Sequence, residues 1–391
     1  MIARAHAAAL ALAFAAVSCR PAVAPPKPGD PLAGLSPAER DSFDRGRVVF
    51  DSVFTPATGL GPLFNAERCA ECHEDPVPGG TGDEIERHAT AFHPETPPPG
   101  RACNELADSG GPVFELRVTP ALKAALGIDS EPVPRSATAI GRRTTPIIFG
   151  FGLLDAVPDS VILSYADPDD RDHDGISGRP NRNFDGRIGR FGRKALVPTL
   201  REFNAGALSA EQGITTPEVP DEQTVAGRPL PAGTDPAPDP ELSQAQVDLL
   251  DAFVRFLAPP APLKETPEAH EGRETFGKIG CTGCHIPTLR TGDSPVPALR
   301  HREVAAYTDL LLHDMGADLA DICLGLATPA EFRTEPLMGL HLRSKFLHDG
   351  RAASPDQAIT LHGGEGATAR DRFLHLAPPE REALVAFLKT L

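Results

Sequence analysis

The sequence predicts a mainly α-helical fold made of two related halves, with long loops and few short strands. A Cys-X-X-Cys-His pentapeptide occurs twice, at residues 69–73 and 281–285. Each pentapeptide follows a segment that begins Gly-Arg and ends in phenylalanine, at residues 46–50 and 272–276. The segments that close the two halves also share apolar residues at the same offsets. Internal duplication explains all three observations.

Each half is expected to open with a short helix, then present its pentapeptide, and then end in a second helix. The closing helices are predicted at residues 242–257 and 376–391, because their apolar residues recur at helical spacing. This is the order of elements in a cytochrome c module. We therefore predict a first cytochrome c-like domain with long insertions at residues 38–258, and a second at residues 263–391.

The pentapeptides are the attachment signature of c-type haem. The two cysteines form thioethers with the haem vinyl groups, and the adjacent histidine supplies the proximal ligand of the iron. The alternatives are a zinc knuckle and a thioredoxin-like redox pair. Zinc would need four ligands drawn together, and a redox pair needs no histidine at the fifth position. We expect two covalently bound haem c groups, held by Cys69, Cys72, His73, Cys281, Cys284 and His285.

The N-terminus predicts export. An apolar run after Arg4 is too short to span a bilayer and is typical of a signal peptide, predicted over residues 1–18. Cleavage after Ala24 would place a proline just behind the cut, whereas the residues ending at Cys19 resemble a bacterial lipobox. We therefore predict a periplasmic protein anchored to a membrane by a lipid on Cys19, with a Pro-rich tether at residues 19–37.

The net charge of −16 argues against nucleic acid as a partner. It suits either solubility or the docking of a basic protein. A small electron-donor protein of the cytochrome or cupredoxin type is the partner expected for a haem protein of this kind.

Two cysteines outside these motifs, Cys103 and Cys323, are left without an assigned role. A disulfide between them could persist in an oxidising compartment. Two separate buried thiols are equally compatible with the sequence, because sequence alone does not give their separation.

An acidic loop around residues 170–175 has the alternating carboxylates and the sixth-position glycine of a calcium loop. Its predicted calcium ligands are Asp170, Asp172 and Asp174. Extra oxygens could come from Asp167, Asn181 and Asp185, with Asn181 standing where a complete EF-hand has its last acidic ligand. A solvated acidic loop without metal is the alternative.

Beyond the haem motifs, five segments resemble the di-haem oxidoreductase family of peroxidase-like proteins, which are distant relatives of bacterial di-haem cytochrome c peroxidases. These segments are residues 64–68, 150–154, 189–195, 313–316 and 346–352. Two residues depart from the family pattern: Met338 stands where the family tends to have tryptophan, and Arg193 replaces an aromatic residue. Since the chain contains no tryptophan, electrons would pass between haem edges directly or through another group.

The resemblance implies that one haem accepts electrons and stays six-coordinate, while the other reacts with a peroxide-like oxidant. The function expected on this basis is reduction of hydrogen peroxide with electrons passed between the two haems. A non-enzymatic electron carrier and an oxidase that acts on side chains of a partner protein are the alternatives.

Several further residues are candidates for the two haem sites. His88 and His93 follow the first pentapeptide in a polar segment and could provide a displaceable sixth ligand, or could be solvated loop residues. His348 is predicted to contact a haem pocket or propionate with a catalytic role, or to cap a turn. Met315, next to His313 in the sequence motif, could ligate iron or line the pocket.

His362 is the sharpest prediction. In the di-haem peroxidases the His-Asp-Gly motif is followed by a helix and then by the methionine that ligates the electron-entry haem. Here a helix start at Ser354, with Pro355 in its first turn, follows His348-Asp349-Gly350, and His362 occupies the place of the methionine. The resemblance therefore implies that His362 is the second axial ligand of the second haem. A polar histidine at the end of a helix is the alternative.

Overall fold

The structure, a computed structural model, describes residues 25–96 and 102–391. The predicted signal peptide and the lipid attachment site at Cys19 lie outside the described residues. Within the described part of the chain, no helix is both long enough and apolar enough to cross a membrane.

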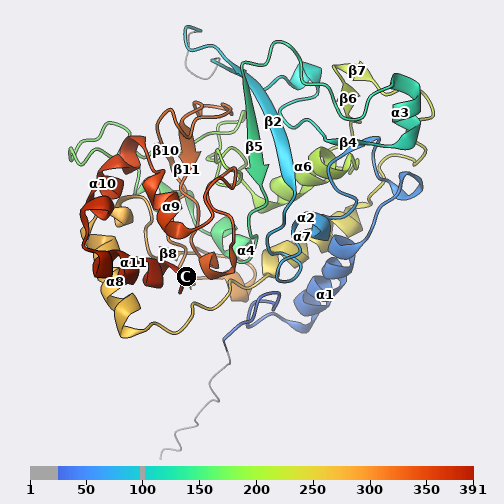
Figure 1. Ribbon diagram of the computed structural model, residues 1–391. Helices are drawn as coiled ribbons and strands as arrows, with labels where there is room; N and C mark the ends of the chain where they lie inside the picture. The colour runs from blue at the N-terminus through green and yellow to red at the C-terminus, as the bar shows by residue number, and fades with distance from the viewer. Residues whose placement is uncertain (1–24, 97–101) are drawn as a thin grey trace, which may run out of the picture.

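Helices and short strands alternate along the chain, and long loops join them (Figure 1). The helices are α1 (Pro37–Asp51), α2 (Cys69–Cys72), α3 (Pro120–Leu126), α4 (Phe151–Asp155), α5 (Asp159–Leu163), α6 (Leu200–Gln212), α7 (Gln244–Phe256), α8 (Pro267–Lys278), α9 (Pro355–Thr360), α10 (Ala367–His375) and α11 (Pro378–Leu388). The strands are β1 (Leu63–Phe64), β2 (Ile85–Phe92), β3 (Cys103–Asn104), β4 (Arg117–Val118), β5 (Ala139–Thr144), β6 (Thr224–Val225), β7 (Arg228–Pro229), β8 (Leu289–Arg290), β9 (Glu303–Val304), β10 (Leu312–Asp314) and β11 (Glu331–Arg333).

The two predicted opening helices, α1 and α8, begin in similar ways. Ser36 and Glu39 form a capping box at the start of α1, and Thr266 accepts a hydrogen bond from the third residue of α8. Each helix also has proline in its first turn, where the missing N–H costs no hydrogen bond. Both therefore form where the sequence places them.

Each opening helix packs against its closing helix, α1 on α7 and α8 on α11. A glycine lies at each crossing: a Cβ on Gly46 would sit 1.9 Å from the Leu249 carbonyl oxygen, and one on Gly272 would sit 1.9 Å from that of Ala383. The two crossings are built alike because backbone meets backbone only where a side chain is missing. This repeat confirms the predicted helix pairs, whereas the finer description as two cytochrome c-like domains stays a prediction.

Substituting Gly272 with alanine should therefore separate α8 from α11 and destabilise the protein by about 3 kcal/mol. Gly277 on the same helix is the matched control, since a Cβ there would meet nothing within 4 Å. Gly277→Ala should be neutral or should stabilise by up to about 1 kcal/mol through helix propensity. Urea unfolding of both variants measures the difference, and equal stabilities would contradict the glycine-mediated crossing.

Strands β2 and β5 pair side by side and are longer than the short strands that the sequence predicted (Figure 1). Strand β3 pairs with the other edge of β2, which gives a three-stranded antiparallel sheet with the order β3-β2-β5. The alternative that His88 is a solvated loop residue was wrong, because His88 belongs to β2 and pairs with Gly141 of β5. The inner face of β2 is made of small side chains, with Ala89 and Ala91 buried against Phe114. Alanines give a weak strand signal, because strand patterns are recognised from branched and aromatic residues.

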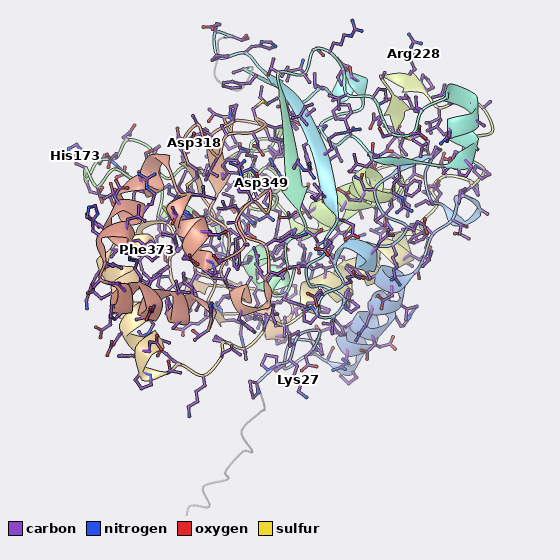
Figure 2. The ribbon with its side chains drawn as sticks, in the orientation of Figure 1. Lys27, His173, Arg228, Asp318, Asp349 and Phe373 are labelled. Atoms are coloured by element: carbon purple, nitrogen blue, oxygen red, sulfur yellow. A yellow bond between two sulfur atoms is a disulfide. The ribbon has the colours of Figure 1, made fainter. Side chains whose placement is uncertain are left out.

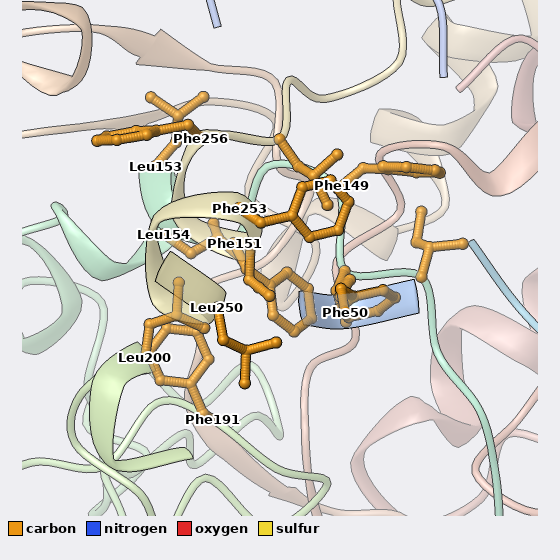
Figure 3. Close-up of a cluster of buried hydrophobic side chains, with 14 of the residues drawn as sticks. Phe50, Phe149, Phe151, Leu153, Leu154, Phe191, Leu200, Leu250, Phe253 and Phe256 are labelled. Atoms are coloured by element: carbon orange, nitrogen blue, oxygen red, sulfur yellow. The ribbon is translucent and has the colours of Figure 1, made fainter. Parts of the chain in front are cut away.

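The main core gathers side chains from α1, α4, α6 and α7 (Figure 3). Its aromatic centre includes Phe50 and Phe253, whose ring centroids lie 4.9 Å apart. Leu311 and Met338 from the second half belong to the same core, so the two halves are joined by apolar packing. Met338 packs beside Gly150, whose positive φ and missing Cβ leave room for the sulfur.

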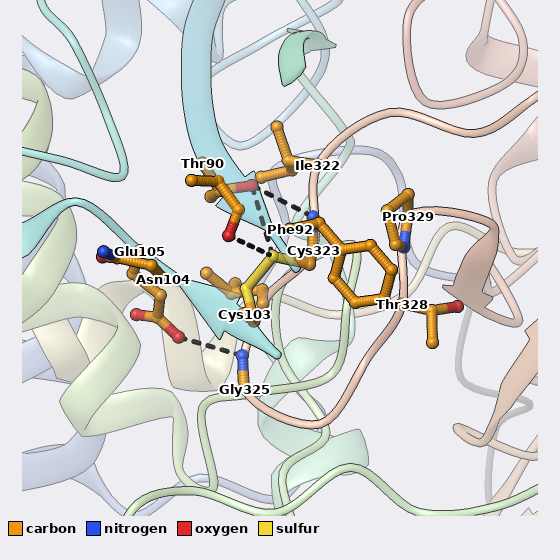
Figure 4. Close-up of a disulfide and its surroundings, with 12 residues drawn as sticks. Thr90, Phe92, Cys103, Asn104, Glu105, Ile322, Cys323, Gly325, Thr328 and Pro329 are labelled. Atoms are coloured by element: carbon orange, nitrogen blue, oxygen red, sulfur yellow. Dashed lines mark hydrogen bonds between the residues drawn. A yellow bond between two sulfur atoms is a disulfide. The ribbon is translucent and has the colours of Figure 1, made fainter. Parts of the chain in front are cut away.

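Cys103 and Cys323 form a disulfide with a Cα–Cα distance of 5.7 Å (Figure 4). This finding decides between the two alternatives left open by the sequence. Thr90 of β2 accepts a hydrogen bond from the Cys323 amide at 3.2 Å, and Glu105 accepts one from Gly325 at 2.9 Å. The crosslink thus joins the edge strand of the first half to a loop of the second.

Candidate functional site

A cavity of 690 Å³ lies in the C-terminal half, at the second pentapeptide. Its walls come from α8, the β10–β11 hairpin, the loop before α9, and helices α9 and α10. Apolar side chains line much of it, among them Phe276, Leu337, Leu340, Phe346 and Ile359. Cys281, Cys284 and His285 lie in the same wall. Two thiols, an imidazole and an apolar enclosure fit a covalently attached haem.

His285 is oriented by a hydrogen bond to the backbone. Its Nδ1 donates a hydrogen bond to the Tyr307 carbonyl at 2.9 Å, which fixes the proton on Nδ1 and leaves Nε2 free. Burial lowers the pKa of His285 to about 4, so the ring stays neutral near pH 7. The Phe276 ring packs at 6.3 Å from the imidazole and helps to fix its orientation.

His362 follows α9 and lines the same cavity. Its Nδ1 donates to the Ala358 carbonyl at 2.7 Å, so its Nε2 is also free. Burial lowers the pKa of this ring, and its charge would in turn lower the pKa of His285. Two neutral histidines therefore share one cavity, each oriented through a backbone carbonyl in the manner typical of metal ligands.

His313 and Met315 lie in the cavity wall but differ in what they can do. The two ring nitrogens of His313 contact carboxylates, Asp309 at 2.8 Å and Glu365 at 2.7 Å. Burial alone would lower the pKa of His313, but its hydrogen bonds with Asp309, Cys284 and Glu365 raise it to about 12. A protonated imidazole cannot ligate iron. Met315 stays available as a lining group beside His362.

His348 also lines the cavity, as the sequence predicted for a pocket contact. Its ring stacks on Phe332 with centroids 4.3 Å apart, and its Nε2 lies 3.5 Å from Asp321. Burial is the main cause that lowers its pKa to about 4. Its carbonyl accepts a hydrogen bond from Thr144 of β5 at 3.0 Å, so the segment also ties the two halves together. A catalytic role for His348 stays a prediction.

The first pentapeptide repeats the arrangement of the second. His73 donates from Nδ1 to the Gly80 carbonyl at 3.1 Å, and burial lowers its pKa. The ring centroids of Phe50 on α1 and His73 lie 6.2 Å apart, and Phe276 of α8 packs on His285 in the same way. Beside Cys69, the buried Nε2 of Gln212 has no partner among the described residues. Oriented imidazole, thiols and an unpartnered polar atom fit a haem here as well.

Two carboxyl groups that the sequence did not single out lie close to the first pentapeptide. Glu86 of β2 forms a 2.9 Å hydrogen bond with His88, and this bond and nearby positive charges lower its pKa although burial opposes them. Glu211 of α6 has a pKa well above its usual value because of burial and the charge of Glu86. Asn65 from the predicted family motif donates to Glu211 at 2.9 Å. The surroundings of the two carboxyl groups thus move their pKa values in opposite directions.

His88 is half-buried, and its Nδ1 has no hydrogen-bond partner within the described residues. His93 lies just beyond β2 and is exposed. Neither histidine lines the cavity at the second pentapeptide. A role for either as a ligand of the first haem stays a prediction.

The acidic loop brings oxygens of Asp170, Asp172 and Asp174 within 4.8 Å of one another. His173 of this loop lies at the outer edge of the second half and lines its cavity (Figure 2). The prediction that Asn181 could supply an extra oxygen was wrong, because its side chain is buried and bonded to the backbones of Lys194 and Leu326. Calcium in the loop stays a prediction, which metal analysis of gently purified protein tests.

Solved structures of low identity match the chain. Hydrazine synthase of Kuenenia stuttgartiensis is 15% identical with a TM-score of 0.42, covering 98% of this chain and 100% of that one. The diheme peroxidase BthA of Burkholderia thailandensis is 15% identical with a TM-score of 0.41, covering 91% and 86%. A MauG-like protein associated with microbial copper homeostasis is 18% identical with a TM-score of 0.31, covering 67% and 91%. No curated protein matches the sequence.

The family described as "Di-haem oxidoreductase, putative peroxidase" matches residues 128–391. This range contains the second pentapeptide and every residue described above as lining the large cavity. The chain belongs to the di-haem oxidoreductase family.

Proposed function

We propose that the protein is an exported di-haem c-type cytochrome that reduces hydrogen peroxide at one haem with electrons received through the other. The observation that carries this proposal is the difference between two otherwise similar sites. The second site holds a second oriented, neutral histidine, His362, whereas the first has an acidic pair, Glu86 and Glu211. One site is therefore suited to stable six-coordination and the other to proton transfer.

At the second site, His285 and His362 would hold the iron from their Nε2 atoms. Haem supplies one-electron chemistry when bound, and with an open sixth position it can also cleave a peroxide bond. The hydrogen bonds of His285 and His362 to backbone carbonyls keep both imidazole rings in this orientation. The apolar wall would keep water away from the haem. Electron transfer is faster when few surrounding groups have to reorient, and a dry site meets this condition. We assign electron entry to this site.

At the first site, His73 would hold the iron, and the acidic pair would handle protons. Glu211, whose pKa burial and the charge of Glu86 raise well above its usual value, would donate a proton to an oxygen that leaves during peroxide cleavage. Glu86, whose pKa is lowered and which is hydrogen-bonded to His88, would accept a proton. Two carboxyl groups whose surroundings move their pKa values apart provide an acid and a base at one pH.

Peroxide added to the half-reduced protein tests this function. We expect rapid oxidation of a donor in the wild type and a rate about 10²–10⁴-fold lower in Glu211→Gln, which keeps the shape of the side chain but removes its acid. Glu218→Gln is the control, since Glu218 pairs with Arg201 at the surface. If excess peroxide causes neither a spectral change nor donor oxidation in the wild type, the protein is an electron carrier instead.

We also propose that a small basic electron-donor protein docks on this acidic chain, whose net charge is −16. Lipid attachment at Cys19 and a periplasmic location remain part of the proposal, and they rest on the N-terminal sequence alone. Membrane fractionation of the wild type and of Cys19→Ser tests the anchor.

A further inference from the structure

Three arginines converge on one carboxylate between the two halves of the molecule. Glu335 pairs with Arg193 at 2.8 Å, with Arg333 at 2.7 Å and with Arg343 at 2.8 Å. The side chains of the three arginines are 13%, 3% and 9% exposed, respectively. We call these four residues the arginine cluster.

The arginine cluster carries more positive than negative charge. Its single carboxylate stays ionised, since the arginines hold the pKa of Glu335 far below its usual value although burial opposes them. Among the described residues, none of the three arginines pairs with another carboxylate. The Nε donors of Arg333 and Arg343 are moreover buried without a partner in the described chain. Because uncompensated buried charge costs several kcal/mol, the cluster is built for anionic ligands.

The arginine cluster lines two neighbouring cavities. All four residues line the large cavity at the second pentapeptide. Arg193 and Arg343 also line a small cavity together with Gly82, and a Cβ on Gly82 would lie 2.0 Å from the Cys72 carbonyl oxygen. Arg193 further donates to the Thr144 carbonyl at 3.0 Å, beside the segment that contacts His73. The cluster thus lies between the first pentapeptide and the second.

We propose that the arginine cluster is a shared anion site that binds one propionate carboxylate from each haem. Two carboxylates would balance the excess positive charge, and guanidinium groups pair with carboxylates through two parallel hydrogen bonds. Arg193 comes from the first half of the chain and Arg333 and Arg343 come from the second, so the cluster would join the two haem sites through charged groups. The inference rests on the two-haem part of the proposed function and is independent of peroxide reduction.

The reduction potentials of the two haems test the proposal. A spectroelectrochemical titration of Arg343→Gln should show both potentials lowered, because two propionates lose part of their counter-charge. We expect about a tenfold change in each reduction equilibrium, which corresponds to 59 mV for one electron. Arg343→Lys should restore most of the shift, since it retains the charge. Arg201→Gln, which removes a surface ion pair with Glu218 and Asp248, should leave both potentials unchanged.

A shift at one haem alone, or at neither, would overturn the shared site. If Arg343→Gln does not fold, Arg193→Gln provides the same test from the other side of the cluster, with the same expected shifts. Haem staining of the wild type separates the two proposals: a chain without haem defeats the proposed function itself, whereas a haem-loaded chain with unshifted potentials defeats only the arginine cluster as the shared site.

Discussion

Replacing His362 with alanine is expected to change the second haem from low-spin to high-spin, since the iron would lose its sixth ligand. The imidazole is neutral, its Nδ1 proton is committed to the Ala358 carbonyl, and its Nε2 shares a cavity with His285. Replacing His362 with methionine should instead keep the haem low-spin and raise its potential by on the order of 0.1 V, within the roughly 0.8 V that axial ligands span. Absorption and near-infrared spectra measure the ligation, and redox titration measures the potential.

His375 provides a matched control for this experiment. Its Nδ1 donates to the Asp371 carbonyl at 2.6 Å, which is the same backbone contact four residues back, but its side chain is exposed on α10. His375→Ala should leave both the spectrum and the potential unchanged. If His362→Ala does the same, His362 is not the ligand, and Met315 becomes the candidate in the same cavity.

Removing the disulfide should have the largest effect on stability. Cys103 and Cys323 are 220 residues apart, and a crosslink over so long a loop restricts the unfolded chain strongly. Replacing both with serine is expected to lower the free energy of unfolding by about 2–5 kcal/mol. Urea unfolding with and without reductant measures it: reductant should destabilise the wild type towards the stability of the double variant and leave the variant unchanged. Equal stability of wild type and variant would show that the crosslink contributes nothing.

The sequence predicted the elements whose signals are local. The helices around Gly46 and Gly272 were recognised from short repeated patterns, and so were the two closing helices. The helix start at Pro355 was likewise recognised from its capping residues. In each case the residues that determine the element lie within a few positions of one another, so tertiary contacts were not needed to identify them.

The features that the sequence missed depend on contacts between distant segments. Strand β2 was not recognised from the sequence because its inward residues are alanines, and its pairing with β5 and its packing on Phe114 stabilise it. The acidic pair joins Glu86 on β2 with Glu211 on α6, and no short pattern connects them. Arg193 was noted only as a departure from the family pattern, since its partner Glu335 lies far along the chain.

The mass of the denatured protein is the most direct test of two covalently attached haems. We expect the wild type to be heavier by two haem groups than a variant in which all four pentapeptide cysteines, Cys69, Cys72, Cys281 and Cys284, are alanine. A variant without Cys281 and Cys284 alone should keep one haem, as should one without Cys69 and Cys72 alone. Because all forms share the same N-terminus, its processing does not affect the comparison. The two covalent haems would be contradicted if the wild type released its haem on denaturation. Its mass would then equal that of the four-alanine variant, after allowance for the four replaced sulfur atoms.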